Sequence, residues 1–287
     1  MVPTLGLAYA PTLPPERLQS VARAVEDAGL EELWVWEDCF KESAIASATA
    51  ALAWTSRLTV GIGLMPVPLR NVAVCAMEVA MLARMFPGRL IAGVGHGVQE
   101  WMGQVGAKVA SPLTLLEEYA GALRQLLGGE RVSAEGRYVT LDGVALDWPP
   151  DVAPPLMLGG AGPKSISLAA RLGDGNILIN ALTDDEVGSI AELVAQERGA
   201  GHPIVATQIA ATGAGAAERL AAEIPRWGRP ADLDIGVAGD AETIADSIRR
   251  LADLGATSVV VQPTEDEPDL DGFIRFLGAE VKPLLRR

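Results

Sequence analysis

The 287-residue chain is most informative at residues 58–71, which read LTVGIGLMPVPLRN, and at residues 89–97, which read RLIAGVGHG. Each segment begins as a short apolar run and ends in a glycine-rich turn, the first at Gly61–Gly63 and the second at Gly93–Gly97. Glycine has no side chain, so both turns present backbone at the end of a strand, where a flat ligand can approach closely. We therefore expect the two turns to open onto one pocket.

Outward from these segments, short apolar runs alternate with helical patterns, which is typical of repeated βα units around a parallel sheet. Eight runs are expected to form strands: Leu5–Tyr9, Glu32–Trp36, Leu58–Gly63, Leu90–Gly95, Leu156–Gly159, Gly175–Ile179, Ile204–Ala210 and Ser258–Gln262. Eight units within one domain, residues 1–287, predict an eight-stranded parallel β/α (TIM) barrel of the α/β class, with its active site at the carboxyl ends of the strands. An open doubly wound sheet is the alternative, but no strand is followed by GxGxxG, and eight units exceed the usual six strands.

The alternation is interrupted at residues 128–155, between the fourth and fifth βα units. Apolar and polar residues alternate there, and turn signals stand at Glu135-Gly136 and at Asp142-Gly143. This pattern predicts an inserted hairpin.

Composition limits the partners of the chain. A net charge of −14 weighs against nucleic acid or an anionic membrane, because both require clustered Lys and Arg. Glu78 and Arg84 interrupt the longest apolar run, residues 72–86, and no basic leader or apolar signal core precedes the first strand, so we expect a soluble, cytoplasmic protein. The two cysteines, Cys39 and Cys75, have no metal-binding spacing, and neither a disulfide nor a metal site is expected.

A third glycine-rich strand end, LMLGGAGPKS at residues 156–165, leads directly into a helical pattern. Free N–H groups and the helix dipole make the amino end of a helix a binding site for anions. The sequence therefore predicts a phosphate cradle here, the alternative being a flexible glycine turn with a solvated lysine.

Two carboxylates and a thiol end the second strand, in WEDCF at residues 36–40. Glu37 and Asp38 are the candidates for bonding a cofactor edge or for moving a proton, and the alternative is a pair of solvated loop carboxylates. His96 in the second glycine turn and His202 before the seventh strand are more typical of structural histidines when considered alone.

Six motifs occur in an order and spacing that resemble the luciferase-like flavin and deazaflavin oxidoreductases: WEDCF, GIGLMPVPLRN, PGRLIAGVGHG, EWMGQVG, GGAGPKS and GDG. The resemblance covers nearly the whole chain. Residues 97–106, GVQEWMGQVG, and residues 111–119, SPLTLLEEY, most resemble the branch that uses the deazaflavin coenzyme F420.

The resemblance implies a cofactor site at the barrel mouth. The ring would rest on a bulge with a non-prolyl cis peptide between Gly63 and Leu64, and Asp38 would be the acidic residue beside it. The remaining cofactor contacts implied by motif position are Met65 at the bulge, Gly95, His96, Gly97 and Val98 along the ring and its tail, and Gly159, Gly160, Ala161, Gly162, Pro163 and Lys164 at the phosphate.

The implied activity is hydride transfer between F420 and an unidentified organic small molecule, by a cytoplasmic homodimer. Cys39 occupies a position that is often histidine in the dehydrogenases of the family, so Glu37 and Asp38 are the candidates for catalytic proton transfer. The apolar side chains of Trp36, Phe40, Met65, Trp101 and Met102 suggest a hydrophobic or planar substrate, the alternative being that they pack in loops or at a dimer interface. Two alternatives stay open, an FMN-dependent luciferase-like monooxygenase and a non-catalytic flavin-binding member. A barrel isomerase or aldolase acting on a phosphorylated substrate is more remote, because no well-placed set of Lys, Glu and His stands at the strand ends.

Overall fold

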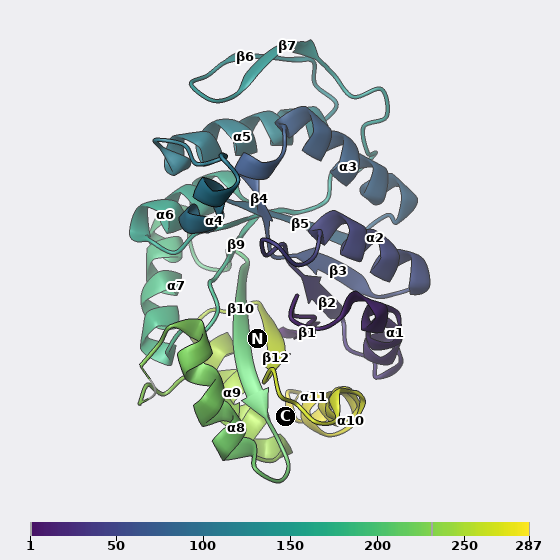
Figure 1. Ribbon diagram of the computed structural model, residues 1–287, viewed down its shortest axis with the longest axis vertical. Coiled ribbons are helices and arrows are strands. Elements are labelled where there is room, and N and C mark those ends of the chain that lie inside the picture. The colour runs from purple at the N-terminus through teal and green to yellow at the C-terminus, as the bar shows by residue number, and fades with distance from the viewer. Residues whose placement is uncertain (1, 231, 287) are drawn as a thin grey trace.

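Eight parallel strands close into a barrel in the computed structural model, which describes residues 2–230 and 232–286 (Figure 1). The strands are β1 (Thr4–Ala8), β2 (Glu32–Val35), β3 (Thr59–Ile62), β5 (Leu90–Gly95), β8 (Leu156–Gly159), β9 (Gly175–Ile177), β10 (Ile204–Ala211) and β12 (Ser258–Pro263). Each pairs in parallel with its neighbours, and the pairs β9–β10, β10–β12 and β12–β1 complete the ring. The predicted β/α barrel is confirmed.

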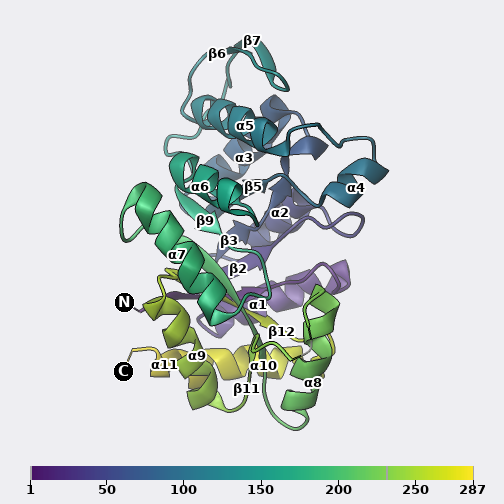
Figure 2. The same cartoon turned by 90° about the vertical axis from the view of Figure 1, so that its left-hand side faces the viewer.

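Helices surround the barrel. They are α1 (Leu18–Asp27), α2 (Ala44–Trp54), α3 (Val72–Met85), α4 (Gln99–Gln104), α5 (Pro112–Leu127), α6 (Pro163–Leu172), α7 (Asp184–Arg198), α8 (Ala216–Glu223), α9 (Ala241–Asp253), α10 (Leu270–Phe276) and α11 (Lys282–Leu284). Side chains of Asn71, Ser111 and Thr183 accept hydrogen bonds from the first turns of α3, α5 and α7, which fixes where those helices begin. Figure 2 shows α4 and α8 on the opposite side of the barrel from the two chain ends.

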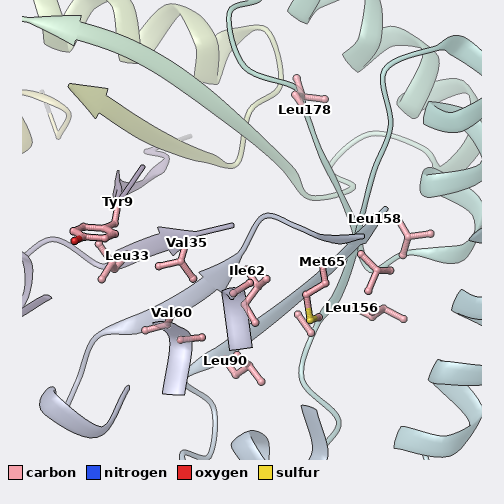
Figure 3. Packing of buried hydrophobic residues seen from close by; sticks show 14 of the residues in the cluster. Tyr9, Leu33, Val35, Val60, Ile62, Met65, Leu90, Leu156, Leu158 and Leu178 are labelled. Atoms are coloured by element: carbon pink, nitrogen blue, oxygen red, sulfur yellow. The ribbon is translucent and has the colours of Figure 1, made fainter. Parts of the chain in front are cut away.

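The hydrophobic core has two layers because side chains alternate along each strand. Leu33 and Val35 of β2 belong to the layer between the sheet and the helices, part of which is drawn in Figure 3. Trp34 belongs to a second cluster that fills the barrel with apolar side chains from six strands. Below it, Glu32 accepts hydrogen bonds of 2.7 Å from Trp34 Nε1 and from Ser258 Oγ.

Trp34 also explains two of the glycines at the strand ends. A Cβ atom added at Gly61 would collide with the Trp34 ring, and one added at Gly63 would lie 2.9 Å from it. Gly61 is therefore required by packing inside the barrel, which corrects the expectation that it presents backbone to a ligand.

The predicted insertion is confirmed as an antiparallel hairpin of β6 (Val132–Glu135) and β7 (Thr140–Val144), above α5 in Figure 1. Glu118 of α5 holds its turn by accepting hydrogen bonds from the backbone N–H groups of residues 137, 138 and 139. Two turns were expected in this segment, and the structure has a turn only at Glu135-Gly136. Asp142 and Gly143 lie within β7 as a bulge opposite Ser133, with Gly143 at φ 60°.

Some elements differ from the sequence-based expectation. The sixth barrel strand ends at Ile177 rather than Ile179, and the short strands β4 (Met65–Pro66) and β11 (Val237–Ala238) were not expected. The closing helical segment is divided by a π-helical turn, Leu277–Val281, where Gly278 packs closely on the backbone of Ala28. Within the described residues, no helix combines the length and apolarity needed to cross a membrane.

Candidate functional site

A cavity of about 400 Å³ lies at the carboxyl ends of the barrel strands. Its lining comes from the segments that follow β2, β3, β5, β8 and β9, together with Trp101 of α4 and Trp227 beyond α8. The two glycine turns of the sequence, after β3 and after β5, therefore open onto the same space.

Leu64 forms the floor of this cavity. Its side chain lies so close to Gly95 and Gly159 that a Cβ atom at either glycine would overlap Leu64 Cδ2. Because only hydrogen fits at these two strand ends, the Leu64 side chain can pack over both glycines and against the apolar cluster that contains Trp34. The cavity floor is thus apolar and follows from packing between three strands.

Asp38 lines the cavity beside Trp36. Burial raises the pKa of the Asp38 carboxyl, while a hydrogen bond from the Trp36 side chain and the charge of Lys41 oppose the shift. A raised pKa makes the protonated form of the carboxyl easier to reach, which is the direction that acid–base catalysis near neutral pH requires.

Glu37 also lines the cavity, but its oxygens are held by other groups. Arg70 donates to both carboxylate oxygens at 3.0 Å, and the Ala44 N–H at the start of α2 donates to Oε2 at 3.1 Å. Glu78 lies 3.4 Å from Arg70 Nε and joins the same cluster. Glu37 thus ties the segment after β2 to α2 and to the segment before α3.

His96 faces the glycine loop after β8. Its Nε2 lies 3.4 Å from Ser165 Oγ, and its Nδ1 lies 3.2 Å from the Gly97 carbonyl oxygen. Gly160 is required here because a Cβ atom would collide with Ser165. The loop then enters α6 at Gly162, where no side chain caps the helix, so the amino end keeps free N–H groups.

Most of the residues singled out in the sequence meet at this cavity, namely Glu37, Asp38, Gly63, Leu64, His96, Gly97, Val98, Gly159, Gly160 and Ala161. Gly162, Pro163 and Lys164 are not part of its lining and form the adjoining amino end of α6. Two placements differ from the expectation. Met65 is buried in the core (Figure 3), and Gly95 is covered by Leu64.

Three other side chains expected at the rim are buried, directed to solvent or unreactive. Met102 is fully buried, and Phe40 is 68% exposed. Burial, with the charges of Glu37 and Asp38, raises the pKa of the Cys39 thiol, which keeps it in its less reactive protonated form. His202 lies below the barrel, 3.2 Å from the Asn176 side chain, in a structural position.

The sequence analysis missed the cavity wall formed by Leu178–Asn180 and Trp227. A polar residue directly after a barrel strand, as in ILIN at 177–180, is a signal that would have found Asn180. Trp227 gave no such signal, since it follows a short helix and reaches the mouth through tertiary packing.

Two non-prolyl peptide bonds are cis, Gly63–Leu64 at the floor and Cys39–Phe40 at the rim. The first is the bond named in the sequence analysis, and nothing in the sequence indicated the second. Among the described residues, no group of three His, Cys, Asp or Glu side chains is arranged to hold a metal ion.

Comparison with known families identifies this barrel. The model of the luciferase-like monooxygenase family matches residues 4–227. This chain belongs to that family. Its cavity at the strand ends is therefore the mouth of a luciferase-like barrel.

Curated relatives of this luciferase-like protein include F420-dependent enzymes. It is 29% identical over 179 residues to the 5,10-methylenetetrahydromethanopterin reductase of Methanolobus tindarius, with 62% of this chain and 54% of that protein covered. It is 32% identical over 185 residues to the F420-dependent glucose-6-phosphate dehydrogenase of Kineococcus radiotolerans, with 59% and 54% covered. The match thus spans about half the length of each relative.

Among solved structures, an F420-dependent secondary alcohol dehydrogenase in complex with an F420–acetone adduct superimposes with a TM-score of 0.85. The two chains are 22% identical, and each is covered completely. At that identity, the likeness demonstrates a shared luciferase-like fold.

Proposed function

We propose that this protein is an F420-dependent oxidoreductase that transfers a hydride between the deazaflavin cofactor and an organic small molecule. The observation that carries the proposal is the convergence of three glycine-rich strand ends and Asp38 on one cavity. The F420-dependent dehydrogenases among its relatives support the choice of cofactor.

The residues present fit a flat ring with a phosphorylated tail. Leu64 supplies an apolar floor, and the backbone at residues 96–98 and 159–161 supplies the walls. The uncapped amino end of α6 offers free N–H groups to a phosphate, and the exposed Lys164 adds a positive charge beside them.

When bound, F420 supplies a ring carbon that accepts or donates a hydride. The side chains of this protein hold the reactants together, exclude water and move the accompanying proton. We assign the proton to the Asp38 carboxyl, because it lines the cavity and its pKa is raised by burial. Glu37 acts as a positioning residue, since Arg70 and the Ala44 N–H hold both of its oxygens.

Parallel titration of the apo-protein with F420 and with FMN tests this assignment. We expect saturable binding of F420, followed by changes in its absorbance when an oxidisable or reducible substrate is added. Binding of FMN without binding of F420 would overturn the proposal in favour of an FMN-dependent monooxygenase. Binding of F420 without turnover of any substrate in a broad panel would indicate a non-catalytic member.

We also propose that the protein is a homodimer. The outer face of α3 exposes Val74, Met77, Met81 and Met85, which recur at helical spacing and are 46–61% exposed. A continuous apolar stripe of this kind is unusual on a monomer and is typical of a subunit interface.

A further inference from the structure

The lining residues of the cavity that are not assigned to the cofactor, here called the aromatic side, are rich in aromatic surface. Trp36, Trp101 and Trp227 all line it and are half-buried, and Ile179 and Asn180 complete this side. Tryptophan combines a large apolar ring with one polar N–H group. If the N–H group is already hydrogen-bonded within the protein, the ring offers a ligand an apolar surface only.

Trp227 uses its N–H group within the protein. Its Nε1 donates to Glu223 Oε1 at 3.0 Å, and Glu223 is buried at the end of α8. Glu223 Oε2 also accepts from the Glu265 N–H at 3.0 Å and from Arg226 at 3.0 Å. The indole is therefore anchored to the loop after β12 and presents an apolar face to the cavity. The Trp36 side chain lies beside the Asp38 carboxyl and favours its charged form, which opposes the rise in pKa caused by burial.

Asn180 is the uncharged polar group of this side. The chain turns sharply after it at Ala181, which has a φ of 59°, a left-handed conformation that is unfavourable for an L-residue other than glycine. Asn180 Nδ2 donates to Gln262 Oε1 at 2.9 Å, which fixes the orientation of the amide. A strained turn that places an oriented amide in a cavity points to a ligand contact.

The charges of the lining restrict the substrate further. The described residues that line this cavity include the carboxylates Glu37 and Asp38 but neither Lys nor Arg. Arg70 is directed to Glu37 and Glu78 and lines a different cavity. An anionic substrate would lose its hydration beside a carboxylate without gaining a cation, which is unfavourable.

We propose that the substrate is an uncharged, planar organic molecule that packs against Trp36 and Trp227 and forms a hydrogen bond with the Asn180 side chain. This inference rests on the proposed function only in assigning the strand ends at residues 96–98 and 159–161 to F420. It sets the site apart from one that accepts a sugar phosphate or a carboxylate.

Calorimetry with three probes tests the proposal, using protein with and without F420. The probes are 2-acetylnaphthalene, an uncharged planar ketone, its anionic counterpart 2-naphthoate, and glucose 6-phosphate. We expect the ketone to bind at least tenfold more tightly than either anion. Because each comparison is also made without F420, failure of cofactor binding is recorded separately and leaves the ranking of probes measurable.

Variants then identify the surface that binds the ketone. Loss of one large aromatic contact in W227A should weaken ketone binding roughly tenfold, and W227F should restore most of it. E223Q, which weakens the anchor of the indole, should give an intermediate loss, whereas W148A, on an exposed loop, should change nothing. Tighter binding of either anion, no binding of the ketone, or unchanged ketone affinity in W227A would overturn the proposal.

Discussion

Asp38 combines a place in the cavity with a pKa raised by burial. If it moves the proton, D38N should lower kcat about 10²- to 10⁴-fold while F420 affinity changes little, since general acid–base catalysis contributes about that factor. Stopped-flow absorbance of F420 measures the rate, and fluorescence titration measures the affinity. A D38N enzyme with near-normal kcat would remove Asp38 from the mechanism.

The same residue should affect stability with a definite sign. Folded protein retains the Asp38 proton over a pH range in which the unfolded chain has lost it, so the wild type loses stability as pH rises through that range. Asparagine cannot ionise. The stability of D38N relative to wild type should therefore increase from about pH 4 toward neutrality. Denaturant titrations at several pH values, with exposed D253N as a control, measure the difference.

Glu37 and Arg70 form an ion pair whose side chains are only 9% and 16% exposed. Removing either partner leaves the other as an unpaired charge that water solvates poorly. E37Q and R70M should therefore each lower the free energy of unfolding by roughly 3 kcal/mol. The double variant should lose less than the sum of the two. D271N, which removes the exposed partner of Arg17, should cost less than about 1 kcal/mol. Equal effects of E37Q and D271N in urea denaturation would contradict this assignment.

At the level of strands and helices, the glycines that end the barrel strands serve two purposes. Some line the cavity, and others leave room for a large side chain from a neighbouring strand. Periodicity and glycine turns were sufficient to predict the barrel, its hairpin and the meeting of residues 63–64 with 96–98. They could not reveal that Gly61 accommodates Trp34, or that Gly95 and Gly159 accommodate Leu64, because those contacts join separate strands. Trp227 could not be predicted for a similar reason, since its position depends on its anchor at Glu223, whereas Asn180 directly follows a barrel strand and is recognisable from that position.

The Leu64 floor gives a direct test of this packing. A methyl group at residue 159 would push Leu64 into the cavity, so G159A should weaken F420 binding roughly tenfold, as overpacking costs about 1–3 kcal/mol. Gly121 offers a matched control, because a Cβ atom there has no neighbour within 4 Å and lies within α5. G121A should raise the free energy of unfolding by about 0.5–1 kcal/mol without changing F420 affinity. Unaltered F420 binding in G159A would show that Leu64 is not the floor.

For the molecule as a whole, the α3 stripe predicts a salt-dependent dimer. Each copy carries a net charge of −14, so added salt should strengthen association by screening repulsion between copies. M81E should give monomers with an intact far-ultraviolet spectrum, and V2E, at a separate exposed valine, should leave the dimer unchanged. Light scattering after size exclusion measures both. A monomeric wild type at high concentration and high salt would contradict the prediction.

The pairing of β1 with β12 joins residues 4–7 to residues 258–261. During translation β1 leaves the ribosome long before β12 is made, so the growing chain carries an open strand edge while the residues between these two strands are synthesised. Such edges are where nascent proteins pair wrongly. Closure of this barrel is thus expected to be a late, single event in biosynthesis, and the cavity at its mouth forms only after that event.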